Sequence, residues 1–116
     1  MRGLYEGAEA LTDTGSTAGV AKELGAPVVL VVNARSITRS AAAIVRGFRD
    51  FDPALRIRGV ILNNIGSEGH RRKATEAIEH FSGVPVLGAV PYAEGMALEM
   101  RHLGLVPYLE GREDRA

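Results

Sequence analysis

The sequence predicts an α/β fold in which a parallel sheet has helices on both faces. Three short apolar runs support this prediction, at residues 28–33, 59–64 and 84–91. Each run is separated from the next by a stretch with the apolar spacing of an amphipathic helix. Strands that alternate with helices are typical of parallel sheets, and continuous apolar runs are typical of strands buried on both faces.

Local signals give the expected bounds of the elements. The expected order is a helix at 16–24, a strand at 28–32, a helix at about 37–51, a strand at 57–62, a helix at 68–81, a strand at 86–90, a short helix at about 94–102 and a further short strand at 103–108. Ser16 or Thr17, Ser36 and Ser67 are candidate helix caps, and Gly25 and Gly83 can adopt the left-handed conformation that ends a helix.

Composition narrows the class of protein. The 116 residues are enough for one compact domain, and 46% of them are hydrophobic. Fourteen basic and fourteen acidic residues give a formal net charge of zero, which argues against nucleic acid or an anionic membrane as the main partner. No apolar run has the roughly 18 residues of a membrane helix, and no leader pattern follows Met1, so a cytoplasmic location is expected. The absence of cysteine excludes a Cys nucleophile within this chain.

The ends of the predicted strands carry residues that suit a ligand. Parallel sheets bind ligands outside the carboxyl ends of their strands, where Asn33, Asn63, Asn64 and Pro91 are expected. The two adjacent asparagines are either turn formers or a donor and acceptor pair for the edge of an adenine base. Arg35 follows the first strand, at a corner where an anionic ligand would meet it.

Two other groups of polar residues have competing interpretations. The segment from Arg2 to Gly7 holds a carboxylate between glycines, with Tyr5 beside it, and is either an ordinary loop or a contact for a metal ion or polar substrate. The three histidines, His70, His80 and His102, lack the spacing of metal ligands and are expected at the surface.

No phosphate-binding loop is visible in the chain. A sheet of three strands also has two edges, and an exposed apolar edge favours association. We therefore expect either a further strand upstream or a partner that covers the edge, and a homodimer is one form of that partner.

The motifs together resemble the cobyrinic acid a,c-diamide synthase family. The resemblance covers residues 2 to about 110, and its most specific pieces are the segments 2–7, 15–18, 26–32, 35–43, 59–63, 83–88 and 101–107. Arg2, Glu6 and the run 33–39 make the chain most similar to the nickel-sirohydrochlorin a,c-diamide synthases of coenzyme F430 synthesis.

This resemblance implies part of a larger enzyme. The family has a synthetase domain with a P-loop NTPase fold, similar to dethiobiotin synthetase, that uses ATP and Mg²⁺ to activate acetate side chains of a tetrapyrrole. A glutaminase domain with a Cys nucleophile supplies ammonia. Residues 1–110 match the rear portion of the synthetase domain, without its N-terminal P-loop unit, and 111–116 form a charged tail. The chain alone would then be inactive, with the P-loop segment and the glutaminase domain or subunit as missing partners.

The resemblance also implies roles for single residues. Glu6 matches an acidic position associated with Mg²⁺ or substrate, Asn63 matches an asparagine that binds adenine, and Pro91 lines the adenine pocket. The residues expected to face the substrate are Gly3, Tyr5, Ser16, Thr17 and Arg35.

A non-enzymatic alternative stays open. A tetrapyrrole-binding or oligomeric scaffold module could keep this fold after losing the phosphate site. The neutral charge and the exposed sheet edge are compatible with such a module.

Overall fold

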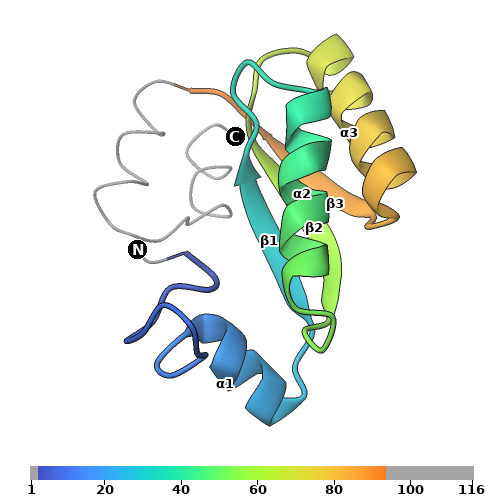
Figure 1. The fold of residues 1–116 in the computed structure, drawn as a ribbon. Helices are drawn as coiled ribbons and strands as arrows, with labels where there is room; N and C mark the ends of the chain where they lie inside the picture. The colour runs from blue at the N-terminus through green and yellow to red at the C-terminus, as the bar shows by residue number, and fades with distance from the viewer. Residues whose placement is uncertain (1–2, 94–116) are drawn as a thin grey trace.

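A computed structural model describes residues 3–93 (Figure 1). Its elements are α1 Thr17–Leu24, β1 Val28–Asn33, α2 Arg39–Phe51, β2 Ile57–Ile65, α3 Glu68–Ser82 and β3 Val86–Pro91. The predicted alternation of parallel strands and helices is confirmed. The expected short helix at 94–102, the strand at 103–108 and the tail at 111–116 lie outside the described residues.

The three strands form one parallel sheet in the order β1-β2-β3. Leu30 lies opposite Val60 and Val32 opposite Leu62, and these four side chains point to the same face. Helices α2 and α3 cover that face and pack against each other (Figure 1). The core between sheet and helices is completed by small and branched side chains, namely Ala41, Ala42, Val45, Ala74 and Ile78.

The sequence predicts helices on both faces of the sheet. Within residues 3–93, however, α2 and α3 lie on the same face. Burial alternates along β1, and the residues Val29, Val31 and Leu87 are 45%, 51% and 60% exposed. The reason is the strand order. Crossovers between parallel strands are right-handed, so two crossovers that advance in the same direction put both helices on the same face of the sheet.

Local signals explain most helix ends. Ser16 Oγ accepts the N–H of Gly19 at 2.9 Å, and Ser67 Oγ accepts that of His70 at 3.0 Å, as expected of capping serines. Gly83 ends α3 with a φ of +72°. The expected cap at Ser36 is wrong, because Ser36 has a φ of +61° in the turn after β1 and α2 begins three residues later at Arg39.

The N-terminal part of the described chain packs through a second, smaller apolar cluster. Ala18 and Ala21 of α1 and Leu55 are its buried members, and Val28 and Ile57 at the starts of β1 and β2 pack against it. Helix α1 therefore lies near the amino ends of the strands, as Figure 1 shows.

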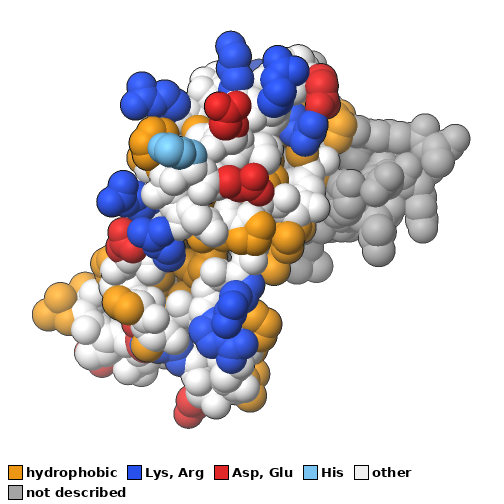
Figure 2. Space-filling view, turned by 90° about the vertical axis from the view of Figure 1, so that its right-hand side faces the viewer, with side chains coloured by type: hydrophobic (Ala, Val, Ile, Leu, Met, Phe, Trp, Pro, Cys, Tyr) orange, Lys and Arg blue, Asp and Glu red, His pale blue; other side chains and the backbone are white. Residues whose placement is uncertain are grey.

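The charged side chains are mixed in sign on the face seen in Figure 2, where Asp and Glu lie among Lys and Arg. None of the described helices has the length and apolar character needed to span a membrane.

Candidate functional site

The ends of the three strands align at one edge of the sheet. Asn33 at the end of β1 lies opposite Asn63 of β2, and Pro91 at the end of β3 lies opposite Ile65. Parallel pairing alone brings these strand ends together, as the sequence predicts. We call Asn33, Asn63, Asn64 and Pro91 the carboxyl edge.

Three asparagines of the carboxyl edge form a hydrogen-bonded group. Asn33 Oδ1 accepts from Asn64 Nδ2 at 2.9 Å and from the backbone N–H of Arg35 at 3.1 Å. Asn63 Oδ1 accepts the backbone N–H of Asn64 at 3.0 Å. Because the Asn64 N–H can only donate, the atom of the Asn63 amide that it contacts is the oxygen. Among the described residues no hydrogen bond engages the Asn63 Nδ2 donors, and Oδ1 keeps a second lone pair.

The backbone beside these asparagines adopts an uncommon conformation. Asn64 has a φ of +61°, as does Ser36 after β1, although neither residue is glycine. Asn and Ser hydrogen-bond to nearby backbone, and Asn tolerates the left-handed region better than most residues. Asn64 is thus a turn former, while Asn63 beside it holds the turn and retains free amide donors.

Arg35 and Tyr92 extend the carboxyl edge. The Arg35 guanidinium lies 4.3 Å from the centre of the Tyr92 ring, in a cation–π arrangement, and Tyr92 N–H donates to the carbonyl of Ile65 at 2.8 Å. Tyr92 follows Pro91 directly, so it lies at the end of β3. Sequence reasoning missed Tyr92, although its place next to Pro91 is the signal that would have found it.

His70 has a role that its spacing did not indicate. Its Nδ1 accepts the N–H of Gly66 at 2.9 Å, and its Nε2 lies 2.7 Å from the carbonyl oxygen of Ile37. A neutral ring with its proton on Nε2 satisfies both partners. His70 is half-buried and connects the turn after β2 with the turn after β1. His70 is thus partly exposed, and its ring also holds the two turns together.

The N-terminal loop, residues 3–16, carries the other expected site residues. The Tyr5 ring lies 4.5 Å from the Phe51 ring and 5.7 Å from the Phe48 ring, and its hydroxyl donates to the carbonyl of Phe48 at 2.6 Å. Burial raises the pKa of the Tyr5 hydroxyl, and the carboxylate of Asp52 raises it further. Tyr5 is therefore an anchor of this loop on α2.

The other expected substrate contacts differ in accessibility. Gly3, Glu6 and Thr17 are exposed, whereas Ser16 is buried and its hydroxyl caps α1. Gly7 has no room for a side chain, because a Cβ there would lie 2.5 Å from the carbonyl oxygen of Thr14. The close approach of the two ends of the loop thus depends on this glycine.

The structure does not bring the two groups of expected site residues together. The N-terminal loop contacts Phe48 and Phe51 at the end of α2, which lies near the amino ends of the strands, whereas Asn63, Pro91 and Arg35 lie at the carboxyl edge. The sequence order gives no signal of this separation, because it depends on how the loop packs against α2.

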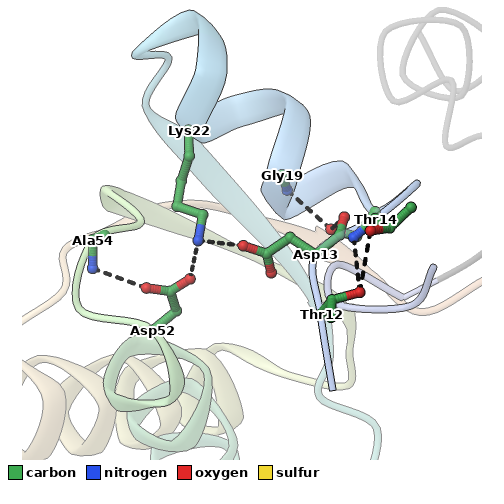
Figure 3. A network of polar contacts seen from close by, with 8 residues as sticks. Thr12, Asp13, Thr14, Gly19, Lys22, Asp52 and Ala54 are labelled. Carbon is green, nitrogen blue, oxygen red and sulfur yellow. Dashed lines mark hydrogen bonds and ion pairs between the residues drawn. The ribbon is translucent and has the colours of Figure 1, made fainter. Parts of the chain in front are cut away.

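An ion network connects the N-terminal loop to α1 and α2 (Figure 3). The Lys22 ammonium lies between the carboxylates of Asp13 and Asp52, at 2.5 Å from Asp52 Oδ2. The ammonium of Lys22 and the N–H of Ala54 hold the pKa of the Asp52 carboxyl below its usual range, and the two carboxylates raise the pKa of Lys22.

Residues 3–93 contain no group of three or more His, Asp or Glu side chains that would hold a metal ion by themselves. Glu6 is exposed and offers a single carboxylate. Mg²⁺ in nucleotide sites commonly takes one or two carboxylates and completes its shell with phosphate and water, so Glu6 suits a shared site of that kind.

Comparisons with known proteins show which family the chain is similar to. A family model described as an AAA domain matches residues 2–100. The chain is 62% identical over 112 residues to the cobyrinate a,c-diamide synthase of Methanosarcina barkeri, covering 97% of this chain and 23% of that protein. It is 52% identical over 114 residues to the synthase of Methanococcus maripaludis, covering 97% of this chain and 26% of that protein.

The chain spans about a quarter of the length of the curated relatives that it matches. No solved structure matches it. The AAA domain match covers most of the chain and agrees with the parallel α/β architecture. The chain therefore belongs to the AAA domain family and matches the cobyrinate a,c-diamide synthases, which confirms the resemblance that its motifs indicated.

Proposed function

We propose that this chain is the base-binding and substrate-facing part of an ATP-dependent, glutamine-dependent a,c-diamide synthase that amidates acetate side chains of a tetrapyrrole. The observation that carries the proposal is the Asn63 amide at the carboxyl edge. Its Oδ1 is held by the N–H of Asn64, and its Nδ2 donors have no partner among the described residues. An amide held in this way can donate to one atom of an adenine edge and accept from another.

The neighbours of Asn63 suit a nucleotide. Tyr92 offers a ring for a planar base, Pro91 lies at the end of the neighbouring strand, and Arg35 adds a positive charge for phosphate or carboxylate groups. Pro91 and Arg35 are thus proposed, with Asn63, as the base and anion contacts of this edge.

The chemistry explains why ATP is required. A carboxylate is a poor electrophile, so its oxygen attacks the γ-phosphorus of ATP, forming an acyl phosphate and releasing ADP. Ammonia then attacks the acyl carbon, phosphate leaves, and the excess proton passes to solvent. When Mg²⁺ is bound it neutralises phosphate charge, and we assign Glu6 to its shell. Gly3, Tyr5, Ser16 and Thr17 would shape the substrate side, with Tyr5 and Ser16 acting by holding the loop.

Parts of this reaction belong to regions beyond this chain. The P-loop unit would bind the phosphates, and a glutaminase domain or subunit would supply ammonia. We propose that this chain is inactive without them. Nickel-sirohydrochlorin is the proposed substrate on the basis of Arg2, Glu6 and the run 33–39, and cobyrinate is the competing one.

The proposal is tested by comparing Asn63→Asp with Asn63→Ala in a full-length synthase that contains this chain. Asn63→Asp keeps the Oδ acceptor for the Asn64 N–H but removes the amide donors. An unmade hydrogen bond of this kind costs about 1–3 kcal/mol, so the KM for ATP should rise roughly 5- to 150-fold in both variants. Arg46→Gln, on the exposed face of α2, is the control. An unchanged KM for ATP in Asn63→Asp would refute the adenine contact.

The exposed apolar face of the sheet favours a second candidate, a non-catalytic tetrapyrrole-binding or oligomeric module. Val29, Val31 and Leu87 would form the contact in a homodimer. Light scattering and a titration with a tetrapyrrole in the absence of ATP separate the two candidates. A dimer that binds the pigment without ATP supports the module, whereas a monomer that does not bind it refutes this candidate.

A further inference from the structure

The N-terminal loop meets the rest of the protein near its two ends. At the first end, Tyr5 packs on Phe48 and Phe51, and the carbonyl of Leu4 accepts the N–H of Ala18 at 3.0 Å. At the second end, the carboxylate of Asp13 pairs with Lys22. These contacts come from opposite ends of the same loop.

Between these attachments the described loop residues hydrogen-bond only to one another. Ala8 N–H donates to the carbonyl of Thr14 at 2.8 Å, and the hydroxyls of Thr12 and Thr14 lie 3.1 Å apart. Residues 8–15 are exposed along their whole length. The loop therefore has little packing of its own to hold it in place, and its position depends on the two attachments.

The second attachment is a three-way junction (Figure 3). Lys22 lies in α1, Asp13 lies in the loop, and Asp52 is the residue that follows α2. Asp52 Oδ1 also accepts the N–H of Ala54 at 3.0 Å, and the carbonyl of Asp13 accepts the hydroxyl of Ser16 at 2.8 Å. One ammonium thus connects the loop, α1 and the turn between α2 and β2.

The junction is partly shielded from solvent. The side chains of Lys22 and Asp52 are 27% and 21% exposed, and that of Asp13 is 45% exposed. Isolated surface ion pairs contribute little to stability, partly because two mobile side chains must be ordered for one contact. A charge shared by two partners that are already fixed makes two contacts while only its own side chain is ordered. Asp52 is fixed by Ala54, and Asp13 is fixed by the cap of α1.

We propose that Lys22 is a positioning residue that clasps the N-terminal loop against α2, so that its exposed residues keep one geometry toward the substrate. The inference rests on the proposed function, because Gly3, Tyr5 and Ser16 of this loop are assigned to the substrate side there. The proposed role of Lys22 needs no contact with substrate or nucleotide. It acts through Asp13 and Asp52.

Hydrogen exchange of this chain tests the clasp without any activity. Lys22→Met keeps the aliphatic stem and removes the charge, so the amides of Ala8 and Ser16 should exchange about tenfold faster, while those of Val60 and Leu62 in β2 stay protected. Lys22→Arg should restore slow exchange. The matched control is Arg71→Met, which removes the Glu68–Arg71 pair of α3. Unchanged exchange of the loop amides in Lys22→Met would overturn the inference.

Asp13→Asn is the second variant, in case Lys22→Met does not fold. It leaves the pair between Lys22 and Asp52 intact and releases only the loop, so it should give the same local increase in exchange. Protection of the loop amides in Asp13→Asn equal to that of the unchanged chain would overturn the clasp.

Kinetics of a full-length synthase that contains this chain test the consequence for the site. The KM for the tetrapyrrole should rise severalfold in Lys22→Met, and Lys22→Arg should recover most of the loss. An unchanged KM for the tetrapyrrole would overturn the positioning role. If the unchanged enzyme amidated no tetrapyrrole, the proposed function would fail, while the exchange experiment would still decide the clasp.

Discussion

Leu62 and Leu87 offer a matched test of which face of the sheet forms the core. Both are leucines in neighbouring strands, but Leu62 is fully buried under α2 and α3, whereas Leu87 is 60% exposed on the opposite face. Leu87 lies over Gly59, the strand residue that leaves it space. We compare Leu62→Ala with Leu87→Ala, which remove the same atoms from the two faces.

The expected costs differ because only one substitution leaves a cavity. Leu62→Ala loses the transfer free energy of a buried leucine and opens a hole in the core, for a total of about 2–5 kcal/mol. Leu87→Ala loses only the buried part of its transfer free energy and opens no enclosed hole, so the cost should be at most about 1 kcal/mol. A domain of this size has a stability of roughly 5–15 kcal/mol, so the larger loss is measurable and can approach complete unfolding.

Urea unfolding followed by far-ultraviolet circular dichroism measures both costs. The midpoint should fall strongly for Leu62→Ala and little for Leu87→Ala, with similar slopes. Equal losses in the two variants would refute the one-sided core, because they would require Leu87 to be as well packed in solution as Leu62. A large fall for Leu87→Ala alone would refute the assignment of the faces.

Two further predictions concern Tyr5 and the glycines. Tyr5→Phe keeps the ring stack and loses the hydrogen bond to Phe48, so it should lower the free energy of unfolding by about 1 kcal/mol at pH 8. The pKa of Tyr5 is higher in the folded protein than in the unfolded chain, where it is about 10. The difference in stability between the two proteins should therefore be full below about pH 10 and disappear as pH rises through the folded pKa. A difference in stability that grew above pH 10 would contradict the hydrogen bond from Tyr5. Gly83→Ala should destabilise by about 1–2 kcal/mol because φ is positive there, although a Cβ would meet no atom within 4 Å. Gly47→Ala, inside α2 and equally free of contacts, should instead stabilise by about 0.5–1 kcal/mol. Urea midpoints that move in the same direction for both glycine variants would refute the conformational explanation.

Much of the carboxyl edge could be predicted from the sequence, because it depends on short-range patterns. Apolar runs locate the strands, and parallel backbone pairing then aligns Asn33, Asn63 and Pro91 at one edge, independently of side-chain contacts. Tyr92 and His70 escaped prediction for a different reason. Their partners, Arg35 and Ile37, lie more than thirty residues away in the chain, and only packing brings them into contact.

Sequence patterns do not indicate where the N-terminal loop lies. The resemblance assigns Glu6 to Mg²⁺ or substrate and Asn63 to adenine, and both roles stay predictions for the full-length protein. Within residues 3–93 the loop lies against α2, held by Tyr5 and by the Asp13–Lys22–Asp52 junction. No local signal marks Lys22 as a partner of Asp52, because the two are thirty residues apart.

The sequence by itself therefore determined the alternation of strands and helices, the serine caps of α1 and α3, and the residues at the strand ends. These features follow from backbone preferences and side-chain spacing within a few residues. Only the tertiary structure decided which face of the sheet is the core, where the N-terminal loop lies and which charges pair. Those features depend on the strand order and on right-handed crossovers, which bring together residues that no local pattern connects.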